Sequence, residues 1–287
     1  MNGTREDRWR DARRNWQAIA RREKGPNVSE TGHDDERRGR VSSHRQRAAR
    51  AGTSLLALAC AICCTTGLLL LAEGAYEDQR YLLLSQTIEM SDDAGGERDW
   101  DALLAQNPEL VAWLTVEGTA IDLPVVQPGE DTDADFYLDH DFWGGCSATG
   151  CPYLDARTDA DGAHLLVYGH HIGLTQQMFS ELFQVYEQDG FDGIGAAVWS
   201  TPDGDVTAFT PVFAMSVDKG YEAIQTFSFE DDNELHAWLL ALGEDATARA
   251  EDWEGLCMDA DRVLTLVTCS NVVGGRRERT LVVFVAT

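Results

Sequence analysis

The sequence predicts a mainly β fold, a closed β-barrel with N-terminal helices and one inserted helix, preceded by a single transmembrane helix. Beyond residue 108, short runs rich in β-branched and aromatic residues alternate with Gly, Asp and Pro turns, as strands of a closed barrel do. Seven such runs lie at residues 111–116, 120–126, 163–168, 196–200, 206–217, 263–268 and 280–286. An uncharged run of 22 residues and one amphipathic stretch predict the two principal helices.

The uncharged run at 51–72 predicts a transmembrane signal anchor. As a helix rising roughly 1.5 Å per residue it would extend about 33 Å, enough to cross a bilayer. Arg45, Arg47 and Arg50 precede the run and acidic residues follow it, so the positive-inside rule places the N-terminus in the cytoplasm. A cleaved signal peptide is the alternative, which the basic region of about 50 residues in front of the run disfavours.

The segments on either side of the anchor differ in charge and in pattern. Residues 1–50 hold 14 basic and 8 acidic residues with little apolar periodicity, which predicts a basic, mostly disordered cytoplasmic tail. Residues 73–107 show helical patterns at 76–92 and 100–106 and predict a helical stalk with N-terminal helices. Residues 108–287 are then the extracellular β-barrel domain.

One helix is expected within the series of strands, at residues 230–249. Leu235, Trp238, Leu239 and Leu242 recur at helical spacing. Ser228 is placed to cap this helix, and acidic residues fill its first turn, where the helix dipole favours them.

The exported part is strongly acidic, with 9 basic and 41 acidic residues beyond position 50. Such a charge repels phosphate backbones, which excludes nucleic acid as a partner. Export also permits disulfides, and Cys146 and Cys151 in GGCSATGCP could close a small ring. The sequence does not supply the Cα separation on which a disulfide depends, so this pairing stays open.

Cys269 is the candidate nucleophile. It ends the apolar run VLTLVT and precedes the polar stretch SNVVGG, so it lies where a strand leaves the core. A buried structural cysteine is the alternative. Three of the nine basic residues of the exported part follow it closely, at Arg276, Arg277 and Arg279. A guanidinium beside a cysteine favours the thiolate and suits an oxyanion, whereas a solvated basic turn is the competing interpretation.

The proton carrier is sought among the histidines of the exported part. His170 and His171 follow the strand AHLLVYG at a Gly turn, just as Cys269 follows its own strand, and strand ends that meet at one rim can build a site. Arg277 and Arg279 share one strand face, and Arg279 is nearer to the strand body. Zinc is disfavoured because the last two cysteines lie twelve residues apart, so no metal or cofactor is expected.

Together, the strand-final TLVTC, the YGHH turn about 100 residues earlier and an Arg about ten residues later resemble the sortase family. The stretches NPELVAWLTVEGTAIDLPVVQ, FYLDHDFWG and YLDAR look like the early strands of class B sortases. The resemblance covers about residues 75–287 and implies the eight-stranded sortase barrel. It further implies Cys269 as nucleophile, His170 as proton carrier and Arg279 as the cation of the site.

The reaction that this resemblance implies is transpeptidation at a Gram-positive cell surface. Cys269 would attack a carbonyl in the C-terminal sorting signal of a secreted protein, and an amine would resolve the thioacyl enzyme. The expected acceptor is a peptidoglycan precursor, with a pilin lysine as the alternative. A hydrolytic cysteine protease stays open, as does a non-catalytic extracellular β-domain in which Cys269 and His170 are core residues.

Three departures from the family pattern affect finer expectations. Val267 stands where class B members often carry a hydroxyl residue, two positions before the cysteine, which leaves the preferred sorting signal open. Arg277 remains a rival of Arg279, and His171 remains a rival of His170.

Overall fold

The computed structural model describes residues 56–69, 72, 74–77, 79–85, 98–173, 175–269 and 278–287, with the backbone alone at Cys269. The predicted cytoplasmic tail, Arg276 and Arg277 lie outside these residues. The chain divides into two units, Met1–Leu70 and Leu71–Thr287.

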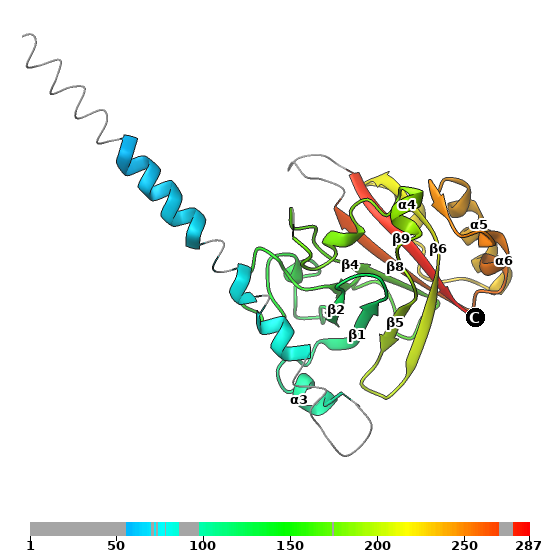
Figure 1. Cartoon of the computed structure of the whole chain (residues 1–287). Helices are drawn as coiled ribbons and strands as arrows, with labels where there is room; N and C mark the ends of the chain where they lie inside the picture. The colour runs from blue at the N-terminus through cyan, green and yellow to red at the C-terminus, as the bar shows by residue number, and fades with distance from the viewer. Residues whose placement is uncertain are drawn as a thin grey trace, which may run out of the picture. The chain divides into compact units, whose positions relative to one another are not determined.

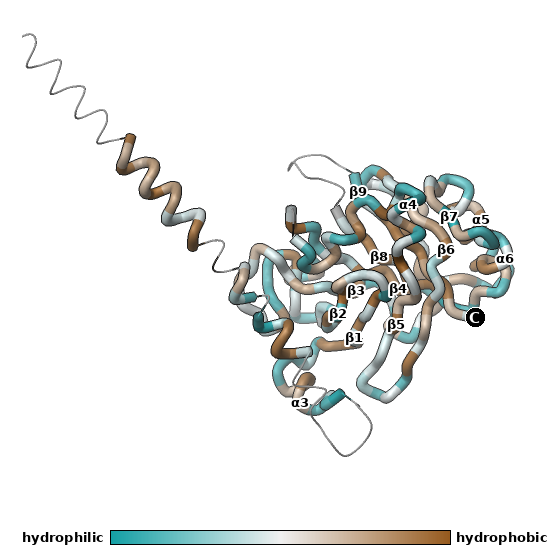
Figure 2. Tube along the Cα trace, viewed as in Figure 1, coloured by the Kyte–Doolittle hydropathy of each residue, from teal (hydrophilic) through white to brown (hydrophobic). Residues whose placement is uncertain are grey.

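Among the described residues, one helix, Leu56–Ser85, is long and apolar enough to cross a membrane. Its first half is largely hydrophobic (Figure 2). The large apolar side chains exposed along this first half are Leu56, Leu58, Ile62, Leu68 and Leu69. An apolar helix surface without protein cover is what a lipid-facing segment requires.

Residues 74–77 and 79–85 of this helix belong to the larger unit. Tyr81 and Leu84 are buried in its core. Arg80 donates to the carboxylate of Asp141 at 2.7 Å. These contacts join the helix to the loop that precedes the third strand.

Eight strands close into a barrel (Figure 1). They are β1 (Leu110–Val116), β2 (Asp122–Val126), β3 (Tyr153–Leu154), β4 (His164–Tyr168), β5 (Ala197–Ser200), β6 (Val206–Asp218), β8 (Arg262–Cys269) and β9 (Glu278–Ala286). The order β5-β1-β2-β3-β4-β8-β9-β6 closes because β6 also pairs with β5. The two-residue β7 (Ala248–Arg249) pairs with β6 outside this ring. The predicted closed eight-stranded barrel is therefore confirmed.

Strands β8 and β9 are covered on both faces. Leu264, Leu266 and Phe284 belong to one apolar cluster with the other barrel strands. Val263 and Val283, on the opposite face, pack in a second cluster with helices α5 (Asp232–Glu244) and α6 (Trp253–Met258). Burial on both faces explains why these two strands read as nearly continuous apolar runs.

The inserted helix differs from its prediction at both ends. α5 begins after Asp231, whose carboxylate accepts the N–H of Glu234 at 3.0 Å, so the predicted cap at Ser228 is wrong. An Asp directly before the apolar repeat satisfies the free N–H groups better than a more distant Ser. The helix ends at Glu244 rather than 249, because the side chain of Arg249 donates to the carbonyls of Gly243 and Glu244.

The remaining helical elements are short. They are α3 (Trp100–Leu104), α4 (Gln188–Phe191) and the 3₁₀ turns Phe136–Leu138, Ser180–Leu182 and Glu222–Ile224. Asp99 caps α3 by accepting the N–H of Ala102 at 3.0 Å.

Candidate active site

Three neighbouring strands bring the predicted catalytic residues to one end of the barrel (Figure 1). β4 and β8 run parallel, and beyond β4 the N–H of Gly169 still donates to the carbonyl of Val267 at 3.0 Å. His170 comes next, and in this register it reaches the level of Cys269, two residues after Val267. β9 places Arg279 directly opposite Cys269. Because paired strands lie about 4.8 Å apart, the backbones of His170, Cys269 and Arg279 lie next to one another.

A pocket of about 270 Å³ opens beside these strand ends. His170 and Arg279 both line it, as do Val267 and Leu281, which pair across β8 and β9. Residues two apart on a strand share a face, so Cys269 holds a strand position on the pocket side. The side chain of Cys269 itself lies outside the described residues.

The ring of His170 is held by the loop that precedes β3. Its Nε2 lies 2.6 Å from the carbonyl oxygen of Leu138, which can only accept, so Nε2 carries the hydrogen. Nδ1 then bears the lone pair of the neutral ring. Gly150, with φ at 63°, passes so close that an added Cβ would lie 3.0 Å from Cδ2 of His170. A side chain at Gly169 would meet the ring of Phe179.

His171 is turned to a different environment. Its ring stacks on Phe183 with centroids 4.3 Å apart, and its Nε2 lies 2.8 Å from the carbonyl oxygen of Gly173. The residues that line the pocket include His170 but not His171. The geometry therefore favours His170 over its neighbour.

Arg279 is half-buried at the wall of the pocket. Its guanidinium donates to the carbonyl of Glu278 at 3.1 Å, and no ion pair with a carboxylate is recorded for it among the described residues. Lys219, which is exposed after β6, also lines the pocket. Two cations thus border this pocket in a domain that is otherwise strongly acidic.

A hydrogen-bonded wall beside the end of β4 was not expected from the sequence. Tyr168 donates to Asp155 at 3.1 Å, and Arg157 joins Asp155 at 2.7 Å and Gln225 at 2.9 Å. Burial first, and then the charge of Asp155, raises the pKa of Tyr168. Tyr168 and Gln225 line the pocket. The wall joins segments that are far apart in the chain, which no local sequence pattern indicates.

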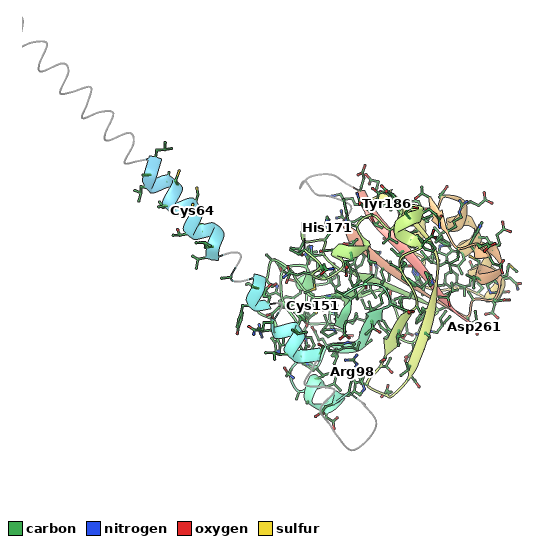
Figure 3. All side chains as sticks on the ribbon, in the orientation of Figure 1. Cys64, Arg98, Cys151, His171, Tyr186 and Asp261 are labelled. Carbon is green, nitrogen blue, oxygen red and sulfur yellow. The ribbon has the colours of Figure 1, made fainter. Side chains whose placement is uncertain are left out.

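The pairing of Cys146 with Cys151 is resolved as two free thiols. Cys151, labelled in Figure 3, is buried and lines the pocket. It follows Gly150, whose backbone lies against the ring of His170. Burial raises the pKa of its thiol, which keeps it protonated. Cys146 is exposed and is not among the residues that line the pocket.

The chain resembles known sortase B proteins in sequence and in structure. It is 29% identical over 85 residues to sortase B of Listeria monocytogenes, a match that covers 29% of this chain and only 33% of that protein. It is 24% identical over 194 residues to sortase B of Staphylococcus aureus, covering 64% of this chain and 72% of that protein. No family model matches the chain.

Among solved structures, sortase B of Clostridium perfringens aligns with a TM-score of 0.56 and 26% identity. The alignment covers 65% of this chain and 98% of that structure. The shared architecture is the closed eight-stranded mixed barrel described above. In sequence and in fold, this chain is similar to class B sortases.

Proposed function

We propose that this chain is a membrane-anchored cysteine transpeptidase. It cleaves a C-terminal sorting signal of secreted proteins and transfers the acyl group to an amine of the peptidoglycan. The observation that supports this proposal is the register of three adjacent strands, in which the backbone of Cys269 is level with His170 and Arg279, two residues that line one pocket. A nucleophile, a proton carrier and a cation on separate strands are the parts that acyl transfer requires.

Each of the three residues has a distinct task in this reaction. Cys269 attacks a backbone carbonyl of the sorting signal and forms a thioacyl enzyme. His170 protonates the leaving amine and later takes a proton from the incoming amine. It does so through Nδ1, because Nε2 is committed to the carbonyl of Leu138. Arg279, opposite Cys269 in the strand register, holds the carbonyl oxygen as it gains negative charge.

The pocket wall supports a peptide as the substrate. Tyr153, Val217 and Ile224 offer apolar surface, while Lys219 adds a cation at the rim. Apolar lining with a few convergent polar groups is typical of a ligand-binding pocket. The carbonyl under attack would lie between Arg279 and the end of β8.

The proposed membrane arrangement follows from charge and hydropathy. Residues 1–50 form a cytoplasmic tail, 51–72 the anchor and 73–107 the stalk, with the catalytic barrel at 108–287 outside the membrane. The helix Leu56–Ser85 supplies a segment of suitable length and composition. This arrangement places the site where secreted proteins and cell-wall amines meet.

The test is a mass-spectrometric assay of the full chain in detergent with a panel of sorting-signal peptides. Each peptide is incubated with triglycine, with Nα-acetyl-lysine or without an added amine. We expect an acyl adduct on Cys269 that an amine resolves into a ligated product. Cys269→Ala should form no adduct, whereas Cys146→Ser, which removes a thiol outside the pocket, should retain full activity.

The product identifies which alternative is correct. Ligation to the lysine derivative in preference to triglycine would indicate pilin polymerisation. Release of the acyl group only to water would indicate a hydrolytic protease. Absence of any adduct across the panel, together with an alkylation rate at Cys269 no faster than that of a free cysteine, would overturn the proposal in favour of a non-catalytic domain.

A further inference from the structure

Cys146 and His140 lie close together on the loop between the 3₁₀ turn Phe136–Leu138 and β3. The Sγ of Cys146 lies 3.9 Å from Nε2 of His140. The other ring nitrogen, Nδ1, lies 2.7 Å from the carboxylate of Asp139. A thiol, an imidazole and a carboxylate therefore stand in series, outside the pocket lined by His170 and Arg279.

The contacts of His140 determine which nitrogen faces the thiol as a base. Nδ1 lies 2.8 Å from the carbonyl oxygen of Phe136, which can only accept, so Nδ1 carries the hydrogen. The carboxylate of Asp139 accepts at the same nitrogen. The neutral ring then directs the lone pair of Nε2 toward Cys146. Stacking on Phe136, with centroids 3.8 Å apart, holds the ring in this orientation.

A tight hairpin fixes the spacing between thiol and ring. His140 and Cys146 form a backbone bridge, and the N–H of Ser147 donates to the carbonyl of Asp139 at 2.8 Å. Inside the hairpin, the carboxylate of Asp141 accepts the N–H of Gly145 at 2.8 Å. Cys146 is exposed, so a small molecule in solution can reach it. The arrangement is preorganised rather than dependent on flexible side chains.

We propose that Cys146 is a base-assisted thiol that exchanges with small disulfides in the surrounding solution. His140 takes the proton of the thiol as sulfur attacks one sulfur of the disulfide. The disulfide bond breaks, a mixed disulfide forms on Cys146, and the departing thiolate receives the proton from His140. The disulfide is the oxidant and is reduced to one thiol, so atoms and electrons balance.

The experiment measures this exchange in the full chain carrying Cys269→Ala, so its result does not depend on the proposed transpeptidation. The probe is 2-hydroxyethyl disulfide, which is uncharged and therefore insensitive to the acidic surface. Peptide mapping by mass spectrometry follows the mixed disulfide at Cys146 over time at pH 7. The heptapeptide WGGCSAT, which is residues 143–149, supplies the rate of the same thiol without His140.

We expect Cys146 to react about tenfold or more faster than the peptide. His140→Gln should remove that advantage, and Asp139→Asn should slow the reaction about threefold, because the Phe136 carbonyl still orients the ring. His236→Gln, a histidine on α5 whose Nε2 contacts the carbonyl of Ala260, is the matched control and should leave the rate unchanged. A folded-state rate equal to that of the peptide, or an undiminished rate in His140→Gln with unchanged thermal unfolding, would overturn the proposal.

Discussion

His164 is the first residue of β4, and His170 lies two positions after the last residue of the same strand. The two histidines differ in burial and in hydrogen bonding. His164 is fully buried, with Nδ1 2.7 Å from the carbonyl oxygen of Thr226 and Nε2 2.9 Å from the hydroxyl of Thr265. His170 is half-buried at a pocket and has one hydrogen-bond partner recorded among the described residues, Leu138.

The difference teaches what makes a histidine available for proton transfer. Both nitrogens of His164 are occupied, and burial lowers its pKa to about 4, so at neutral pH it is a neutral structural link. It joins β4 and β8 to the segment that carries Gln225 at the pocket wall. Among the described residues no partner is recorded for Nδ1 of His170, so this nitrogen is available for the proposed proton transfer.

The largest effect is expected from His170→Ala. The rate of amine transfer should fall by about 10² to 10⁴, because no second histidine is among the described residues that line the pocket. Thermal unfolding should stay within a degree or two of the parent, since the side chain is half-buried. Transfer at more than a tenth of the parental rate would show that His170 is not the proton carrier.

His164→Leu should produce the opposite pattern. The leucine leaves the part-buried carbonyl of Thr226 and the buried hydroxyl of Thr265 without this partner, which should cost roughly 2 to 4 kcal/mol of unfolding free energy. Chemical denaturation measures this loss. Transfer per folded molecule should fall by less than about threefold. If transfer per folded molecule fell by more than about threefold, the distinction between the two histidines would not hold.

The same residue predicts a pH dependence of stability. The folded-state pKa of His164, about 4, lies below the ordinary histidine pKa of 6.5, so the unfolded chain binds the proton first as pH falls. Stability is therefore complete above pH 6.5 and declines as pH falls toward 4. Between pH 7 and pH 5 the loss should be roughly 2 kcal/mol, and His164→Leu should not show it. Equal slopes in both proteins would assign the pH effect to other groups.

A smaller loss of transfer is expected from Gly150→Ala, and a matched control distinguishes contact with His170 from backbone strain. Gly150→Ala introduces a Cβ 2.6 Å from the carbonyl oxygen of Tyr137 and 3.0 Å from the ring of His170, and should lower transfer about tenfold. Gly144→Ala is the matched control in the same loop: its φ is also positive, at 74°, but no atom lies within 4 Å of the added Cβ. It should cost about 1 kcal/mol of stability and leave transfer unchanged. Equal losses of transfer would point to loop strain instead.

The strands were predictable because their runs are long enough to show a pattern. β6, of 13 residues, and β8, of eight, carry many β-branched and aromatic side chains, whereas β3 and β7 have two residues each and give no periodic signal. The inserted helix was predictable from its apolar repeat. Its true ends were not, because a carboxylate at Asp231 and the side chain of Arg249 set them.

The site was predictable only in part, for a related reason. Strand ends and residue type pointed to Cys269 and His170, but the environment that distinguishes His170 from its neighbour is non-local. The partner of His170, Leu138, lies 32 residues away. The contact between His140 and Cys146 likewise depends on how one hairpin folds, which the spacing of the residues does not reveal.

The smallest effect is expected from His171→Gln, and it is the sharpest test of the choice between adjacent histidines. The ring of His171 stacks on Phe183 away from the pocket lining, so glutamine should change transfer by less than about threefold. Stability should fall slightly, because the stacking contact is worth about 0.5 to 1.5 kcal/mol. If His171→Gln instead abolished transfer, and His170→Ala left the pH profile of transfer unchanged, the proton would pass through His171. The contact between Leu138 and His170 would then be structural. The register of β4 with β8, which brings His170 level with Cys269, would not identify the proton carrier.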